Sequence, residues 1–189
     1  MHKDVVPKNI SRRHFLRGAL LAVPAAAALA VPRRSLAAGL DARSINLINT
    51  HTGEALDTTY YRAGEYSAES LGELNWLLRD FRTGDVMTID RELFDLLHDV
   101  AMLADREPSF EVISGYRSAR TNAMLHATSS GVALHSMHTL GRAIDVRLPG
   151  FSTRKLRDLA LSLKAGGVGY YHRSDFVHID TGRVRTWAG

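Results

Sequence analysis

The chain has 189 residues, no cysteine and a formal charge of +4, from 24 basic and 20 acidic residues. Positions 1–37 hold seven basic residues and only one acidic residue, so the rest of the chain holds 17 basic and 19 acidic residues. The excess positive charge therefore gives no argument for a nucleic-acid partner. The lack of cysteine excludes a disulfide framework, so we expect a domain that is held together by its core.

Residues 1–37 have the features of a cleaved secretory leader. The segment SRRHFLR at 11–17 is typical of a twin-arginine signal, and it precedes an apolar run from Gly18 to Val31. The small residues of Ser35-Leu36-Ala37 predict cleavage after Ala37, with Ala38 as the next choice. A membrane anchor is the alternative, but this run is shorter than the roughly 20 residues that span a bilayer. We expect twin-arginine export to the periplasm and one domain, residues 38–189, without a transmembrane segment.

The first part of this domain predicts a hairpin followed by two helices. Two strand patterns between Ser44 and Arg62 are joined at Thr52-Gly53, which is typical of a tight turn. Ser67 and Asp90 each precede a run of leucines at helical spacing, and we expect both residues to cap helices. The apolar stripes expected to face the core are Leu71, Leu74, Leu78 and Phe81 in the first helix, and Leu93, Leu96, Leu97, Val100 and Leu103 in the second.

The second part of the domain mixes strands and helices in an irregular order. Strands are predicted at 110–113, 142–148, 168–171 and 176–180, and helices at 119–128 and 153–165, the latter capped by Ser152. Because strands and helices do not alternate strictly, this order favours an α+β fold with a largely antiparallel central sheet flanked by helices.

The segment SMHTLGRAID at 136–145 predicts a metal site together with FVHID at 176–180. Zinc binds imidazole nitrogen and carboxylate oxygen, and hydrolytic zinc sites have three protein ligands and one open position. His138, Asp145 and His178 supply such a set. His138 and Asp145 are seven positions apart, which would put them on opposite faces of an uninterrupted strand, so we expect the chain to bend at Gly141.

Two further residues near these ligands are assigned different roles. His178 and Asp180 lie two apart on a predicted strand, so they share a face, and Asp180 is suited to orient the ring of His178. His135 lies three residues before His138 but outside the motif. We do not expect His135 to bind metal, because three protein ligands already leave the open position that hydrolysis needs.

Three segments of the chain resemble a known enzyme family. SGYRS at 114–118, SxHxxGxAxD at 136–145 and VHID at 177–180 are similar to the zinc-dependent peptidoglycan peptidases of the D-Ala-D-Ala carboxypeptidase and murein endopeptidase type, which share their fold with the hedgehog signalling domain. A closer likeness to the murein endopeptidases covers nearly all of the chain after the leader, through LINTHTGE at 47–54, GGVGYY at 166–171 and FVHIDTG at 176–182. The resemblance implies a hedgehog-like fold and the same three ligands for Zn²⁺.

The resemblance also implies catalytic residues. Arg117 takes a place beside the scissile bond, where a guanidinium suits a carboxylate or an oxyanion, although an ordinary salt bridge is its alternative. Relatives often carry a glutamate three residues before the last histidine ligand, and Asp175 holds that position here. Asp180 and His172 are the other candidates for the general base, and a site without a dedicated base is also open.

The implied reaction is metal-assisted hydrolysis of amide bonds that cross-link peptidoglycan stem peptides, with meso-diaminopimelate bridges as the target. In this reaction zinc lowers the pKa of a water molecule towards about 7, and a carboxylate takes the proton. Two alternatives remain at this point. One is a catalytically inert, zinc-stabilised module that binds the cell wall or a partner. The other is a zinc carboxypeptidase that releases terminal D-Ala.

Overall fold

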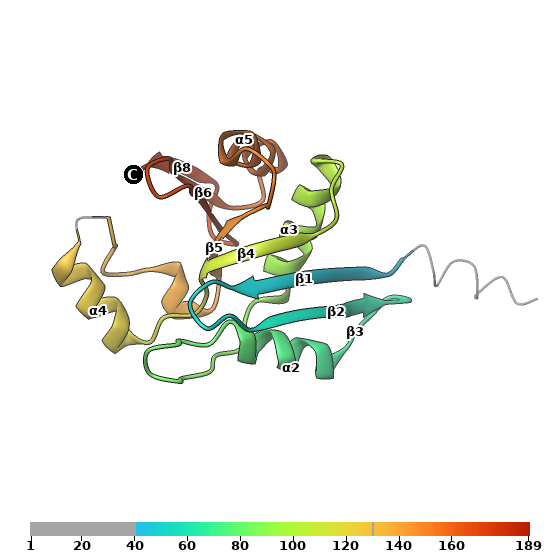
Figure 1. The fold of residues 1–189 in the computed structure, drawn as a ribbon, viewed down its shortest axis with the longest axis horizontal. Helices are drawn as coiled ribbons and strands as arrows, with labels where there is room; N and C mark the ends of the chain where they lie inside the picture. The colour runs from blue at the N-terminus through green and yellow to red at the C-terminus, as the bar shows by residue number, and fades with distance from the viewer. Residues whose placement is uncertain (1–40, 130) are drawn as a thin grey trace, which may run out of the picture. The chain divides into compact units, whose positions relative to one another are not determined.

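The computed structural model describes residues 41–129 and 131–189, and the predicted leader lies outside this part of the chain. The described residues form one sheet with the strand order β3-β2-β1-β4-β5-β7-β6-β8 (Figure 1). The helix α2 packs on β2, α3 packs on β1, and α5 packs on α3, β6 and β7. The elements are β1 Arg43–Asn49, β2 Ala55–Arg62, β3 Glu65–Tyr66, α2 Ala68–Leu77, α3 Arg91–Leu103, β4 Ser109–Ser114, α4 Ala119–Thr128, the 3₁₀ turn η1 Met137–Leu140, β5 Ala143–Arg147, α5 Thr153–Leu163, β6 Gly167–Tyr171, β7 Phe176–Asp180 and β8 Arg185–Ala188.

The predicted α+β class is confirmed, but the sheet is mixed. Five strand pairs are antiparallel, whereas β1 with β4 and β6 with β8 are parallel. The strands β1 and β4 are parallel because α2 and α3 lie between them in the sequence and return the chain to the end of the sheet at which β1 begins. Neither parallel pair was predicted, since β8 has four residues without an apolar alternation and a strand's partner cannot be read from its own pattern.

The predicted helix starts are confirmed, although the side chain of Ser152 makes no capping hydrogen bond at the start of α5. Two of the predicted core positions are wrong. The side chain of Ser67 accepts a hydrogen bond from Ser70 N, and the side chain of Asp90 accepts one from Glu92 N. Helix α2 ends at Leu77, so Phe81 lies beyond it and stacks on a histidine ring instead of joining a helical stripe. Leu103 is 51 % exposed because it occupies the last position of α3, where the helix leaves the core.

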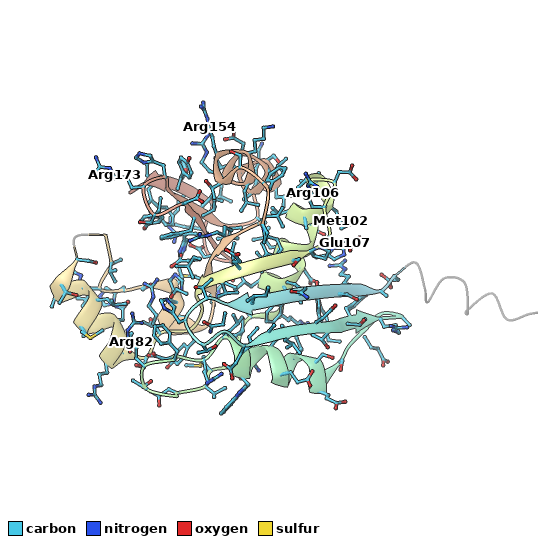
Figure 2. The ribbon with its side chains drawn as sticks, viewed as in Figure 1. Arg82, Met102, Arg106, Glu107, Arg154 and Arg173 are labelled. Atoms are coloured by element: carbon cyan, nitrogen blue, oxygen red, sulfur yellow. The ribbon has the colours of Figure 1, made fainter. Side chains whose placement is uncertain are left out.

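The core lies between the sheet and the helices α2, α3 and α5. Long charged side chains such as Arg106, Arg154 and Arg173 are exposed and point outward (Figure 2). None of the described helices is long and apolar enough to cross a bilayer. The largest fully buried side chains are Tyr60, Phe94, Phe110, Ile45, Leu47, Leu74, Leu78, Leu93, Leu97, Ile144, Leu156 and Ile179.

The strands β5, β7 and β6 have one apolar face and one polar face. Ile144 pairs with Ile179, which pairs with Val168, and all three are buried in the core. The residues between them on each strand project to the other face because side chains alternate along a strand. That other face carries the candidate site.

Candidate metal centre

One transverse row of paired residues crosses four strands on the polar face. Asp145 of β5 pairs with His178 of β7, His178 pairs with Gly169 of β6, and Gly169 pairs with Trp187 of β8. Residues that are directly paired on neighbouring strands project to the same face. The register of the sheet therefore brings a carboxylate, an imidazole and an indole together, with a residue lacking a side chain between the last two.

His138 joins this row from the 3₁₀ turn η1. The side chain of Ser136 accepts a hydrogen bond from His138 N at the start of the turn, and the turn ends at Gly141. Gly141 has φ +66°, and a Cβ atom there would lie 2.5 Å from the carbonyl oxygen of Thr88. Both the backbone conformation and the space require glycine, so the predicted bend at Gly141 is confirmed.

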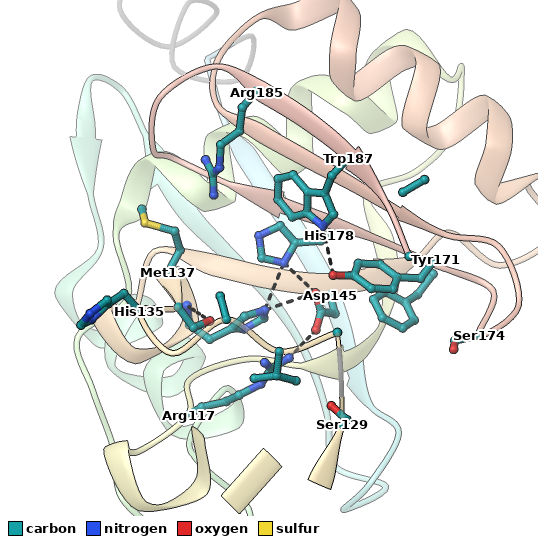
Figure 3. Close-up of a pocket in the computed structure, with 18 of the residues that line it drawn as sticks. Arg117, Ser129, His135, Met137, Asp145, Tyr171, Ser174, His178, Arg185 and Trp187 are labelled. Atoms are coloured by element: carbon teal, nitrogen blue, oxygen red, sulfur yellow. Dashed lines mark hydrogen bonds and ion pairs between the residues drawn. The ribbon is translucent and has the colours of Figure 1, made fainter. Parts of the chain in front are cut away.

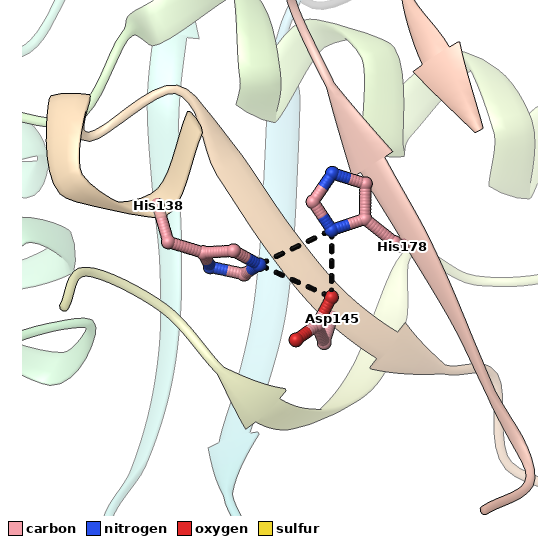
Figure 4. A group of neighbouring side chains, drawn as sticks. All are labelled: His138, Asp145 and His178. Atoms are coloured by element: carbon pink, nitrogen blue, oxygen red, sulfur yellow. Dashed lines mark hydrogen bonds and ion pairs between the residues drawn. The ribbon is translucent and has the colours of Figure 1, made fainter. Parts of the chain in front are cut away.

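The three predicted ligands converge (Figure 4). His138 Nε2 lies 3.2 Å from Asp145 Oδ1 and 3.1 Å from His178 Nδ1, and Nδ1 of His178 lies 2.8 Å from Asp145 Oδ1. The three residues are buried, with exposed fractions of 2, 3 and 6 %. Atoms that share a zinc ion at about 2.0 to 2.2 Å lie roughly 3 to 3.5 Å apart, so this spacing suits a zinc ion or a similar cation.

Hydrogen bonds on the outer sides of the two rings fix which nitrogen faces inward. His138 Nδ1 lies 2.7 Å from the carbonyl oxygen of Gly115, which can only accept, so Nδ1 carries the proton. His178 Nε2 lies 3.0 Å from Asp180 Oδ2 and likewise donates to it. When both imidazoles are neutral, the three converging atoms each present a lone pair with no proton between them. This donor set calls for a positive ion at its centre.

His138, Asp145 and His178 are called the trio from here on. Electrostatics at the trio favour a neutral His138 and an ionised Asp145. Burial lowers the pKa of His138, while Asp145 acts in the opposite direction. Burial would raise the pKa of Asp145, but the two imidazoles hold it well below its usual range. Burial would also lower the pKa of His178, yet its hydrogen bonds to Asp145 and Asp180 raise it overall. A metal ion must therefore displace a proton from His178 in acid, which makes binding pH-dependent.

Asp180 is a fully buried carboxylate whose oxygens are all occupied. It accepts hydrogen bonds from Gly167 N at 3.1 Å and Gly182 N at 2.8 Å, besides the one from His178. Arg185 adds two more, from Nη1 at 3.0 Å and Nη2 at 2.6 Å. Burial would raise the pKa of Asp180, but these donors hold it well below its usual range. Asp180 lies on the same face as His178, as predicted, and contacts its ring rather than open space.

Arg117 reaches the trio from the loop that follows β4. Its Nη2 donates to Asp145 Oδ2 at 2.6 Å, and its Nε donates to Ser114 Oγ at 2.8 Å. Ser114 pairs with Asp145 across β4 and β5, so the arginine closes the row at its other end. The SGYRS segment thus brings Arg117 to the site, where the guanidinium holds the carboxylate that faces the two imidazoles.

The structure does not bring the other two candidate bases to the trio. Asp175 is an exposed turn residue with φ +51° between β6 and β7, and its Oδ1 accepts a hydrogen bond of 2.7 Å from Thr153 Oγ1. Thr153 begins α5, where the helix dipole favours a carboxylate, which accounts for this orientation. His172 is exposed in the same turn. Neither residue lines the cavity above the trio, whereas His135 does line it.

A cavity of about 1070 Å³ opens above the trio (Figure 3). One wall is aromatic: the Trp187 ring lies 5.1 Å from that of His178, and Trp187 Nε1 donates to Tyr171 Oη at 3.0 Å. Tyr171 stacks on Phe176 at 4.5 Å. Trp187 was not among the predicted site residues because β8 was not predicted as a strand. The alternation of Arg185 with Trp187, two apart like Gly167 and Gly169 on β6, is the signal that could have revealed it.

Comparisons with known proteins point to one family. The family model described as peptidoglycan L,D-endopeptidase MepK matches residues 37–187. The peptidoglycan L,D-endopeptidase MepK of Escherichia coli K12 is 43 % identical over 172 residues, 91 % of this chain and 90 % of that protein. The probable peptidoglycan L,D-endopeptidase MepK of Haemophilus influenzae is 45 % identical over 148 residues, 78 % of this chain and 80 % of that protein. No solved structure matches the chain significantly, so the hedgehog-like fold stays a prediction.

Proposed function

Because the chain belongs to the peptidoglycan L,D-endopeptidase MepK family, we propose that it is a zinc-dependent murein endopeptidase that hydrolyses L,D peptide bonds in the cross-links of peptidoglycan. The observation that carries the proposal is the convergence of His138 Nε2, Asp145 Oδ1 and His178 Nδ1 within 3.2 Å of one another. A site of this composition with an adjoining cavity is suited to hydrolysis rather than to a purely structural ion.

We propose that His138, Asp145 and His178 are the metal ligands. Bound Zn²⁺ supplies Lewis-acid polarisation of the scissile carbonyl and lowers the pKa of the attacking water. The remaining residues position these groups. Asp180 and the Gly115 carbonyl hold the two imidazoles by their outer nitrogens, and Arg117 holds Asp145 while its positive charge faces the cavity.

The assignment of the general base follows from which oxygens and nitrogens are accessible. Asp180 has no accessible oxygen, since it is 0 % exposed and receives five hydrogen bonds, so we assign it to positioning His178. Asp175 and His172 lie outside the cavity lining, and we assign Asp175 to the turn that it forms with Thr153. The proposed mechanism therefore uses no dedicated carboxylate base from this set.

The absence of these candidate bases from the cavity lining favours a second candidate function, the inert zinc-binding module. A digest of purified muropeptides separates the two functions. The protein without its leader is incubated with cross-linked muropeptides, with chelator or with added zinc, and the products are identified by mass. Cleavage of the L,D cross-link that chelation removes and zinc restores supports the endopeptidase. Release of D-Ala alone indicates the carboxypeptidase, and bound zinc with intact muropeptides indicates the binding module.

We also propose that residues 1–37 are a twin-arginine leader and that the enzyme acts in the periplasm. The support is the SRRHFLR segment, together with a substrate class that lies outside the cytoplasm. Fractionation of cells that express an Arg12→Lys and Arg13→Lys double variant tests this. The variant should accumulate in the cytoplasm, and unchanged export would rule out the twin-arginine route.

A further inference from the structure

We propose that the Tyr171 hydroxyl is a catalytic group that donates a hydrogen bond to the carbonyl oxygen of the scissile peptide bond. This inference rests on the proposed peptidase function and adds a donor to it. Tyr171 belongs to the β6–β8 side of the cavity, whereas Arg117 comes from the loop after β4. The two donors therefore approach the trio from different parts of the sheet.

The position of Tyr171 follows from the register of β6. Gly167, Gly169 and Tyr171 alternate along this strand, so they share the face on which the trio lies. Gly169 pairs directly with His178, and Tyr171, two residues further, pairs with Phe176. Tyr171 also lines the same cavity as Arg117 and the three proposed ligands, and Figure 3 shows its hydroxyl end directed inward, to where it meets Trp187.

The orientation of the hydroxyl is set by Trp187. The indole N–H can only donate, and its contact of 3.0 Å with Tyr171 Oη uses a lone pair of that oxygen. The phenolic proton is thereby left for another acceptor, and the residues 41–129 and 131–189 offer none within hydrogen-bond distance. Stacking on Phe176 at 4.5 Å, with an angle of 16° between the planes, fixes the ring. The hydroxyl is thus a neutral donor held in place before substrate arrives.

The hydrogen bonds that Arg117 already makes explain why a second donor to the oxyanion is useful. Its Nη2 and Nε are engaged by Asp145 and Ser114, so much of its charge is balanced by a carboxylate within the site. The oxyanion that forms during amide hydrolysis needs donors that are aimed at it and are not otherwise engaged. A phenol supplies such a donor without adding a positive charge beside the metal site.

Gly169 is what permits this arrangement. A Cβ atom at position 169 would lie 2.6 Å from the ring of Trp187. Because glycine leaves this space open, the indole lies over the row, close to His178, and reaches Tyr171 at the same time. Gly169 and Tyr171 of β6 are therefore accounted for by the indole and the hydroxyl together.

The test compares Tyr171→Phe with Tyr170→Phe in the zinc-loaded protein. Tyr170 is the matched control because its side chain is on the other face of β6, against the core and beneath Arg157. We expect Tyr171→Phe to lower kcat on a defined cross-linked muropeptide by about 100-fold or more, the effect of losing one oxyanion donor. KM, zinc content and Tm should stay close to the parent values, and Tyr170→Phe should retain the parent kcat.

Trp187→Phe supplies the second measurement, since it keeps an aromatic ring over His178 but removes the N–H group. We expect a smaller fall in kcat, and we expect the Tyr171→Phe and Trp187→Phe double variant to be no slower than Tyr171→Phe alone, because the indole acts through the hydroxyl. A Tyr171→Phe protein with the parent kcat overturns the inference alone. Loss of zinc or of folded structure in that variant also overturns it, by assigning Tyr171 a structural role. A parent protein that cleaves no muropeptide overturns the proposed function instead, and this inference with it.

Discussion

Two buried carboxylates, Asp80 and Asp145, lie in regions that look alike in burial and charge but differ in what surrounds them. Asp80 is 1 % exposed and Asp145 is 3 % exposed. Asp80 accepts hydrogen bonds from Ser118 N at 2.9 Å, Ser118 Oγ at 2.7 Å and Arg82 N at 3.0 Å. Each of these groups donates to Asp80, so protein donors satisfy its carboxylate.

In the region of Asp145, a hydrogen-bond donor satisfies only one of the two carboxylate oxygens. Arg117 donates to Oδ2, but Oδ1 faces His138 Nε2 and His178 Nδ1. The opposite nitrogen of each ring carries the proton and directs it to the Gly115 carbonyl or to Asp180. Burial and a lowered pKa occur in both regions, so neither feature by itself marks a reactive site. The convergence of several lone pairs, without a proton among them, is what distinguishes a metal site from a structural one.

The largest expected effect follows from removing one of these lone pairs. His138→Ala should abolish stoichiometric zinc binding and lower muropeptide cleavage by about 1000-fold or more, because two ligands remain and the open coordination geometry is lost. Zinc content by metal analysis and turnover by chromatography measure both effects. The matched control is His172→Ala, an exposed histidine outside the cavity lining, which should keep full zinc and full activity. Equal losses in the two variants would contradict the ligand assignment.

A smaller effect is expected from loosening the support of a ligand. Asp180→Asn should weaken zinc affinity by about 10- to 100-fold, because His178 loses a charged acceptor and Arg185 loses its partner. Competition with a chelating dye measures the affinity. Asp175→Asn is the control, a carboxylate five residues earlier that contacts Thr153 and not the trio, and it should bind zinc like the parent. A parent-like affinity in Asp180→Asn would remove Asp180 from the positioning role.

More of the metal centre than of the rest of the sheet was predictable from the sequence, for a physical reason. The bend at Gly141 and the shared face of His178 and Asp180 follow from local backbone rules, and they brought the predicted ligands together. The contribution of Trp187 was not predicted, because β8 is short and its parallel pairing with β6 is a long-range contact that the sequence of β8 does not specify. Asp175 is the opposite case. Its position three residues before His178 predicted a general base, but the turn in which it lies directs its carboxylate to α5.

A third variant changes the packing of the row without touching a ligand. Gly169→Ala would place a Cβ atom 2.6 Å from the Trp187 ring, so we expect a stability loss of about 1–3 kcal/mol and a fall in kcat as the indole moves. Gly72→Ala is the control, since its Cβ would meet nothing within 4 Å on the exposed side of α2. That change should raise stability by about 0.5–1 kcal/mol. Urea unfolding of both proteins measures the difference, and similar effects of the two substitutions would contradict the close packing of Trp187 on β6.

The smallest effect on function, and the sharpest on pH dependence, is expected from Asp80→Asn. Burial would raise the pKa of Asp80, but hydrogen bonds from Thr121, Ser118 and Arg82 lower it to about 2. Because this folded value lies below the ordinary value of about 3.9, the ionised carboxylate stabilises the fold above about pH 4. That contribution disappears as the pH falls from about 4 to about 2.

Asp80→Asn should therefore lower stability at neutral pH, where bonds to a charged acceptor contribute on the order of 2 kcal/mol, and should flatten the acid limb between about pH 4 and pH 2. Urea midpoints of the zinc-free protein across this range are the appropriate measurement, since bound zinc would add the protonation of His178 to the profile. Zinc affinity at pH 7 should match that of the parent, because the carboxylate of Asp80 contacts Ser118 at the start of α4 and Arg82 in its own turn, and none of the proposed metal ligands. If stability falls equally steeply with pH in the two proteins, the ionised Asp80 does not stabilise the fold as its hydrogen bonds indicate. If Asp80→Asn loses zinc, the regions of Asp80 and Asp145 are not independent.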